Sequence, residues 1–356
     1  MKHLCDDSRD HRSNIRVDCA THGLDELMQN DFFYSLVPFI ENVWHRCQSI
    51  DPLTMSQSIE DLKAILKDHP EFAVTEPEPG FPVIEVHSSV SAATIALHGA
   101  QVLTWAPTGH PPVLYVSPKA KMIPGTPLRG GIPICWPWFN KHPEDPSKPA
   151  HGFARTRFWE LVSGDVNGKV VTVVFKLLPD EETRSLFPHE FELTATIRVA
   201  DKLRVKLNMK NTGDDNYRVS SALHTYLSLG DIERIQLEGV KGSHYMDQLT
   251  DDEEAVYQEK NLQIKGEVDR IYQSMSSVLV RDLDRQRSVF VDKAGSRSTV
   301  IWNPWKAKAK AIADLPDSGY KEFVCVECAN AGTDKPILRP NSSHTVETVI
   351  GLRPLN

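Results

Sequence analysis

The sequence has no long apolar run, no glycine-rich nucleotide fingerprint, and only 6 cysteines among its 356 residues. The first absence excludes an ordinary membrane-spanning helix, and the second gives nucleotide cofactors no support. So few cysteines favour reduced thiols over a disulfide framework. Because an apolar secretory signal is also missing, we expect a cytoplasmic protein, with an internal organelle address left open.

The chain also lacks a surplus of basic residues, since its formal net charge is -8. Residues 1–76 contain 14 acidic and 7 basic side chains, whereas the remainder contains 34 and 33. An acid-rich leader is unlike a mitochondrial or plastid transit peptide. The balance excludes a basic footprint for nucleic acid, so we expect neither nucleic acid nor a membrane as a partner.

Apolar residues at helical spacing predict helices between residues 24 and 47 and between 59 and 66. Ser58, with Asp61 three residues later, resembles a capping box for the second helix. We therefore expect an acidic helical extension over residues 1–75. Its role stays open: it could dock on the rest of the protein, mediate self-association, or bind another chain.

The pattern changes after "EPEPGFP" (76–82), which has the composition of a linker. Segments such as "FELTATIRV" (191–199) and "LRVKLNM" (203–209) alternate apolar and polar residues, as strands do. Short strands without long intervening helices indicate an antiparallel sandwich or barrel. We predict a β domain over residues 76–356.

Cysteine and histidine spacings give little support to a metal or redox centre. The pair in "CVEC" lies in a strand-like run, where alternation would point the two thiols to opposite faces. Cysteines and histidines of the leader could be assembled into a zinc site, but they follow no finger spacing; they are Cys5, His11, Cys19, His22, His45 and Cys47. We expect neither a metal nor another cofactor.

Two polar residues stand out because their neighbours are apolar: His224 in "SALHTYL" and Glu327 in "FVCVEC". A carboxylate is almost never buried without a partner, whereas a lone histidine in such a stretch is commonly a satisfied core residue. On strands of one β domain, the two could form an acid/base pair.

The stretch "LRGGIPICWPWF", followed by "HGFART", is rigid, aromatic and cationic. Between residues 118 and 160, seven basic side chains stand against three acidic ones. Arg129 and Arg155 are suited to bidentate contacts with an anion. The tryptophans could stack on a sugar ring, or form a packed plug beside solvated arginines; they are Trp136, Trp138 and Trp159.

Several motifs in their order along the chain resemble the glucose-6-phosphate 1-epimerases, which are relatives of the galactose mutarotases. The resemblance runs from about residue 82 to 353 and includes "LRGGIPICWPWF", "HGFARTRFWEL", "SALHTYLSLGDIERIQLEGVKG", "EVDRIYQ", "IWNPW", "DLPDSGYKEFVCVE" and "NSSHTVETVI". It implies a mainly β fold, a large antiparallel β-sandwich of galactose-mutarotase type, with the helical extension in front of it.

By this resemblance His224 and Glu327 are the catalytic pair, and Arg129 and Arg155 grip a phosphate. His151 and Asp247 fall where sugar hydroxyls are contacted. Family members can have a glutamine before the "HGFAR" histidine. Because Ala150 stands here, that contact is missing or is made by the backbone.

The expected activity is therefore interconversion of the α and β anomers of hexose 6-phosphates, with glutamate as base, histidine as acid, and no cofactor. An epimerase of unphosphorylated aldoses and a catalytically silent sugar-phosphate binder remain alternatives. A glycoside hydrolase fits less well, because it would need two carboxylates across the scissile bond.

Overall fold

Antiparallel strands are the main regular structure of the protein, for which a computed structural model describes residues 56–250 and 254–355. Every pairing between its named strands is antiparallel, so the predicted mainly β architecture is confirmed. The two alternating segments form strands β8 (Phe191–Val199) and β9 (Leu203–Asn211), which pair along their whole length.

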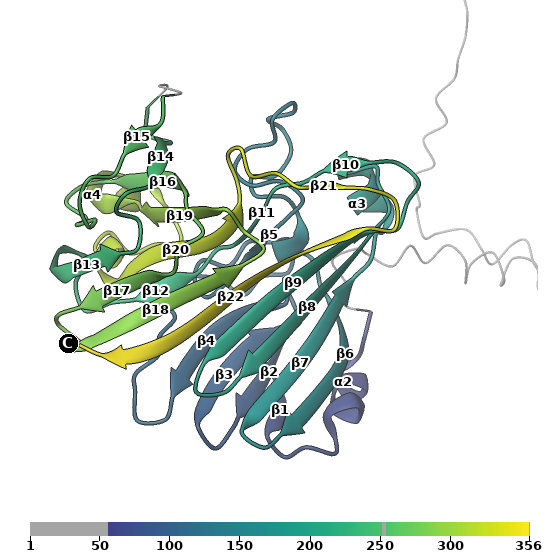
Figure 1. Cartoon of the computed structure of the whole chain (residues 1–356). Helices are drawn as coiled ribbons and strands as arrows, with labels where there is room; N and C mark the ends of the chain where they lie inside the picture. Colours follow the sequence, from purple (N-terminus) through teal and green to yellow (C-terminus); the bar gives the residue numbers. More distant parts are fainter. Residues whose placement is uncertain (1–55, 251–253, 356) are drawn as a thin grey trace, which may run out of the picture. The chain divides into compact units, whose positions relative to one another are not determined.

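One eight-stranded sheet, here called sheet I, dominates the view in Figure 1. Its strands are, in spatial order, β13 (Ile235–Glu238), β17 (Val278–Asp282), β18 (Arg287–Ala294), β22 (Ser343–Pro354), β9, β8, β7 (Val170–Leu177) and β6 (Glu160–Asn167). In β7, β8 and β9 every second residue is buried, because one face of sheet I packs on the core and the other meets solvent.

Sheet II, also of eight strands, contains Glu327 in its strand β20 (Phe323–Asn330). Its strands are, in spatial order, β15 (Val256–Tyr257), β14 (His244–Asp247), β16 (Val268–Gln273), β19 (Ser298–Asn303), β20, β11 (Ser221–Leu223) and β5 (Ile134–Cys135), with β12 (Tyr226–Ser228) also paired to β20. Every residue of β20 is buried, because both faces of this strand are covered.

Sheet III and a short ribbon complete the strands. Sheet III has the order β1 (Phe72–Glu78), β2 (Phe81–His87), β3 (Ser91–Ala96) and β4 (Gln101–Pro107), and the ribbon pairs β10 (Tyr217–Arg218) with β21 (Ile337–Leu338).

Sheets II and III form the second layer of the sandwich. Strand β20 of sheet II packs against β18 and β22, while β3 of sheet III packs against β8. A bridge between Leu114 and Leu227 ties the segment after β4 to β12 of sheet II. The main apolar core lies between the layers, as expected for a sandwich.

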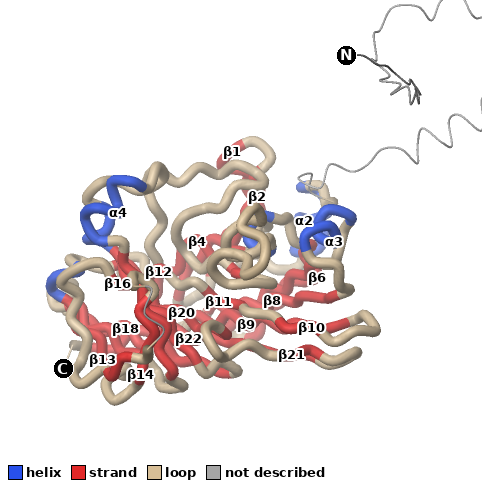
Figure 2. Tube along the Cα trace, turned by 90° about the horizontal axis from the view of Figure 1, so that it is seen from above, coloured by secondary structure: helices blue, strands red, loops and turns tan. Residues whose placement is uncertain are grey.

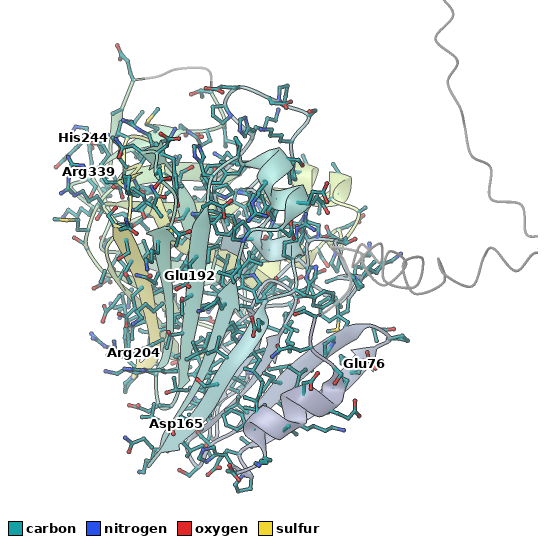
Figure 3. All side chains as sticks on the ribbon, turned by 90° about the vertical axis from the view of Figure 1, so that its right-hand side faces the viewer. Glu76, Asp165, Glu192, Arg204, His244 and Arg339 are labelled. Atoms are coloured by element: carbon teal, nitrogen blue, oxygen red, sulfur yellow. The ribbon has the colours of Figure 1, made fainter. Side chains whose placement is uncertain are left out.

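The helices are short and lie at the margins of the strands (Figure 2). They are α2 (Ile59–Leu66), α3 (Glu181–Leu186), α4 (Trp305–Ala311) and the 3₁₀ turns η1 (Ala154–Thr156), η2 (Ile232–Arg234) and η3 (Gly319–Glu322). Among the described residues, no helix is long and apolar enough to cross a membrane. Because the helices lie at the margins, the outer face of sheet I is exposed to solvent. Polar side chains such as Glu192 and Arg204 lie on this face (Figure 3).

Helix α2 begins at the predicted capping box, in which Ser58 Oγ accepts from the Asp61 amide at 3.1 Å and Asp61 Oδ2 accepts from the Ser58 amide at 2.8 Å. Just before the helix, the Gln57 side chain makes two hydrogen bonds with the backbone of Leu161, at 3.0 and 2.7 Å. Because β6 is an edge strand of sheet I, these bonds cover part of its open edge.

The linker expected at residues 76–82 is instead the hairpin that joins β1 to β2. Strand β1 crosses the expected boundary at residue 75, and α2 buries Leu62 and Leu66 in the main core. The proline and glycine of "EPEPGFP" therefore mark a turn, and α2 belongs with the β domain. The helix expected between residues 24 and 47 lies outside the described residues.

Gly164 should be intolerant of larger side chains, because a Cβ atom there would overlap Leu66 and Phe72, which bring α2 and β1 onto β6. We expect Gly164→Val to lower the free energy of unfolding by about 1–3 kcal/mol. Asp165→Val, at the exposed neighbouring position, is the matched control. Urea unfolding of both variants tests this, and equal stabilities would contradict the packing described.

Candidate active site

A cavity of about 240 Å³ opens on sheet II and contains five of the six residues expected at a site. Its lining comprises Arg129, Phe139, Asn140, His151, Arg155, His224, Tyr226, Asp269, Val300, Trp302, Lys308 and Glu327. These residues come from segments nearly 200 positions apart. The pairing of β16 with β19 and of β19 and β11 with β20 brings several of these segments together.

Arg129 is fixed by its neighbours on both sides of the guanidinium. Its Nε donates to Asp314 Oδ1 at 2.7 Å, and Nη1 donates to the Tyr226 hydroxyl at 3.4 Å. The following Gly130 has a φ of +125°, and a Cβ there would overlap the carbonyl oxygen of Tyr115. Glycine is required at this close approach, and the arginine enters the cavity from it.

His151 and Arg155 are placed by a second tight segment. Gly152, with a φ of +72°, lies directly against the Trp136 carbonyl, where no Cβ fits. The backbone amide of Asn140 donates to His151 Nδ1 at 3.2 Å, so the ring proton of neutral His151 resides on Nε2. Arg155 Nη2 donates to the Ala150 carbonyl at 2.8 Å. Residue 150 thus contributes its backbone, as an anchor for Arg155.

His224 and Glu327 lie together on the cavity floor, with Nε2 and Oε1 separated by 3.4 Å. His224 stacks on Tyr226, the ring centroids being 4.9 Å apart. The pair is almost completely buried, with exposures of 7% and 1%. Neither Glu327 oxygen nor His224 Nδ1 has a hydrogen-bond partner among the described residues, which makes the pair chemically available.

Burial shifts both members of the pair toward their uncharged forms. It lowers the pKa of His224 well below its ordinary value, and the nearby His151, Arg155 and Arg129 add to this effect. It raises the pKa of Glu327 well above its ordinary value, with Asp269 acting in the same direction and Arg155 against it. These directions favour a neutral pair in which Glu327 carries the proton.

Two further cavity residues have displaced pKa values. Burial, followed by Arg155 and Arg129, lowers the pKa of His151 to about 3, which keeps this ring neutral at physiological pH. Burial raises the pKa of Asp269 to about 6, although Lys308 opposes the shift. A neutral histidine and a carboxylate are suitable partners for sugar hydroxyls.

Asp247, expected to contact the sugar, is not among the residues that line the cavity. Its carboxylate lies 3.6 Å from Arg270 Nε, and it also accepts from the Leu249 amide at 3.1 Å. Asp269 on the adjacent strand β16 lines the cavity instead. The motif "EVDRIYQ" contains Asp269, but nothing in its local sequence distinguishes the two aspartates.

Trp136, Trp138 and Trp159 belong to the packed interior, with exposures of 0%, 5% and 1%. Trp136 contacts Phe153, Phe187 and Phe191, and the indole of Trp138 donates to the Pro149 carbonyl at 2.8 Å. The suggestion that they stack on a sugar is therefore wrong. Trp302 on β19, which sequence reasoning missed, is the tryptophan in the cavity lining.

Donor atoms that could bind a metal occur at one place in the described part of the chain. One ligand atom each of His224, Cys325 and Glu327 lies within 4.8 Å of the others. Burial raises the pKa of the Cys325 thiol well above its usual range, so this ligand is protonated when no metal is bound. The cysteines and histidines of the leader lie outside the described residues.

Comparison of the sequence with known families identifies the family of this chain. The aldose 1-epimerase family model matches residues 82–351. The chain therefore belongs to the aldose 1-epimerase family, which is a family of isomerase-type enzymes.

Two relatives are both named "Putative glucose-6-phosphate 1-epimerase". The protein of Escherichia coli (strain K12) is 31% identical over 303 residues, covering 85% of this chain and 95% of its own. The protein of Cenchrus ciliaris is 35% identical over 259 residues, covering 70% of this chain and 77% of its own.

Solved structures agree with the fold. A "putative mutarotase" from Salmonella typhimurium superimposes with a TM-score of 0.75 at 30% identity, covering 80% of this chain and 94% of that one. A galactose mutarotase-like protein from Clostridium acetobutylicum gives a TM-score of 0.64 at 13% identity, covering 80% and 98%. The expected sandwich of galactose-mutarotase type is confirmed.

Replacing Glu327 with glutamine should stabilise the protein increasingly as the pH rises. Above the ordinary value of 4.5 and below the raised pKa, the folded state retains a proton that the unfolded state has lost, so wild-type stability falls with pH. The variant escapes this loss, which is about 1.4 kcal/mol per pH unit within the window.

Urea titrations between about pH 5 and about pH 8 measure the effect. The difference in free energy of unfolding between variant and wild type should widen in favour of the variant. Glu347→Gln on sheet I serves as the control. A difference that is constant or shrinks with pH would contradict a raised pKa at Glu327.

Proposed function

We propose that the protein is a glucose-6-phosphate 1-epimerase, which interconverts the α and β anomers of hexose 6-phosphates. The observation that carries this proposal is the composition of one cavity: an acid/base pair lies on its floor, and two arginines line it. The names of the two relatives described above support the same substrate class.

Anomerisation requires two proton transfers and no other chemistry. A base removes the proton of the C1 hydroxyl while an acid protonates the ring oxygen, which breaks the C1–O5 bond and leaves an aldehyde. Rotation about C1–C2 then presents the other face of the carbonyl to the ring hydroxyl. Closure returns both protons in the reverse sense and yields the other anomer.

His224 and Glu327 can supply both transfers, because the pair holds one proton before ring opening and one proton after it. In the neutral pair Glu327 is the acid toward the ring oxygen, and His224 is the base toward the C1 hydroxyl. This order is the reverse of the one expected from sequence for ring opening. Opening leaves an imidazolium beside a carboxylate, and these opposite charges stabilise each other across the short separation. On closure Glu327 is the base and His224 the acid.

Arg129 and Arg155 are the proposed ligands of the 6-phosphate. Asp314 engages Nε of Arg129, and the Ala150 carbonyl engages one terminal nitrogen of Arg155, so each guanidinium has further donors available for an anion. A phosphate anchored in this way can stay bound while C1 reacts, because anomerisation changes nothing at C6. His151 and Asp269 are the proposed ligands of the ring hydroxyls.

The alternatives are less well supported. An epimerase of free aldoses would have no use for two arginines in the cavity. A silent binding protein would have no use for an acid/base pair. A glycosidase of the usual kind would need two carboxylates across the bond, whereas the pair here is a carboxylate and an imidazole.

Glu327→Gln and His224→Ala should each lower kcat for glucose 6-phosphate anomerisation by about 10²–10⁴-fold, because each removes one proton-transfer group. NMR exchange between the anomers, or a coupled dehydrogenase specific for one anomer, measures the rate. Glu347→Gln, on β22 of sheet I and outside the cavity lining, should retain activity. Full activity in either site variant would overturn the assignment of that residue.

Arg129→Ala and Arg155→Ala should each raise KM for glucose 6-phosphate by roughly tenfold to a hundredfold, the usual effect of losing a hydrogen bond to a charged group. KM for free glucose should change little. Arg297→Ala, an exposed arginine directly before β19 and outside this cavity, is the matched control. Equal losses on both sugars would refute the phosphate contact.

A further inference from the structure

Cys325 lies beside the acid/base pair, although the proposed reaction makes no use of it. It precedes Glu327 by two positions on β20, so strand alternation points both side chains to the same face of sheet II. The thiol is completely buried and free. Its sulfur, one ring nitrogen of His224 and one oxygen of Glu327 all lie within 4.8 Å of one another.

Several polar atoms of His224 and Glu327 have no hydrogen-bond partner in the described part of the chain. Both oxygens of Glu327 and Nδ1 of His224 are buried, yet have no hydrogen-bond partner among the described residues. Buried polar atoms are normally satisfied, so the unpaired carboxylate of Glu327, which lies 3.4 Å from His224 Nε2, indicates room for a ligand between the two side chains. His224 and Glu327 also line the cavity, which gives a small ion a route to them.

The spacing suits a tetrahedral cation. Zn²⁺ binds nitrogen and oxygen at about 2.0–2.2 Å, so two such ligands of one ion are roughly 3.4 Å apart. The separation between His224 Nε2 and Glu327 Oε1 is 3.4 Å. The Cys325 sulfur lies within 4.8 Å of a ligand atom of each of the other two residues, and a thiolate binds Zn²⁺ at the longer distance of about 2.3 Å. Three protein ligands would leave the fourth position open toward the cavity.

Ligand chemistry selects among cations. A thiolate with an imidazole favours Zn²⁺ over Mg²⁺ or Ca²⁺, which prefer oxygen ligands. Arg129 and Arg155 repel a cation in this cavity, but the Cys325 thiolate and the Glu327 carboxylate supply two negative charges when zinc displaces their protons.

We propose that Zn²⁺ binds His224, Cys325 and Glu327 and thereby inhibits the enzyme, because the bound ion occupies both proton-transfer groups and competes with the sugar ring. Binding follows from the geometry alone. Inhibition rests on the proposed function, so the experiment separates the two.

The first measurement is a Cd²⁺ titration, in which a bond to a thiolate produces a charge-transfer band in the ultraviolet. The full-length chain carries Cys5→Ser, Cys19→Ser and Cys47→Ser, so that thiols of the leader cannot contribute. We expect one equivalent of Cd²⁺ to give the band and Zn²⁺ to displace it. Cys325→Ser in this background should abolish the band, whereas Cys135→Ser should retain it. A band that survives Cys325→Ser refutes the site.

The second measurement is anomerisation of glucose 6-phosphate at buffered free Zn²⁺. Cys325→Ser should match wild type without metal and need roughly tenfold more Zn²⁺ for half-inhibition. Cys325→Ala provides the same comparison if the serine variant folds poorly. Equal zinc sensitivity in wild type and both variants would refute inhibition through Cys325. A Cys325-dependent cadmium band in a protein that epimerises no sugar phosphate would instead refute the proposed function and leave the metal site standing.

Discussion

The contact between His224 and Glu327 depends on removing both side chains from water. Each would be charged or strongly hydrated at the surface, and an isolated charge is expensive to bury. Because both side chains are buried, the state of lowest free energy is a neutral pair that retains one proton. Burial in the sandwich therefore favours the uncharged forms of both side chains, and these are the forms from which the proposed ring opening starts. The arginines add a positive potential, which disfavours a protonated histidine further.

Sequence patterns predicted the strands well, because alternation in segments such as β8 and β9 directly reflects a sheet with one buried face. The capping box at Ser58 is equally local, and it too was identified. The hairpin at residues 76–82 was mistaken for a linker, because proline and glycine serve both structures and only the pairing of β1 with β2 distinguishes them.

The motifs predicted five of the residues that line the candidate site. His151, His224 and Glu327 share one cavity with the two arginines, but Asp269 and Trp302 were missed. Their inclusion depends on which residues of β16 and β19 face the cavity, and that face follows from strand register. Trp136, Trp138 and Trp159 were noticed in the sequence, but their role could not be decided there. Their composition fits either a sugar platform or a core, and the packing of Trp136 among phenylalanines makes it core.

Arg129 and Arg155 are anchored differently, and the two anchors differ in their sensitivity to point mutations. Arg129 is oriented by the carboxylate of Asp314, so a single missense change at position 314 removes the anchor. Arg155 is oriented by the main-chain carbonyl of Ala150, which every amino acid possesses. Substitution at position 150 can therefore alter the side chain without deleting this hydrogen-bond acceptor. Of the two proposed phosphate ligands, Arg129 can therefore lose its anchor through a point mutation at position 314. The anchor of Arg155 is a backbone atom and persists whatever residue occupies position 150.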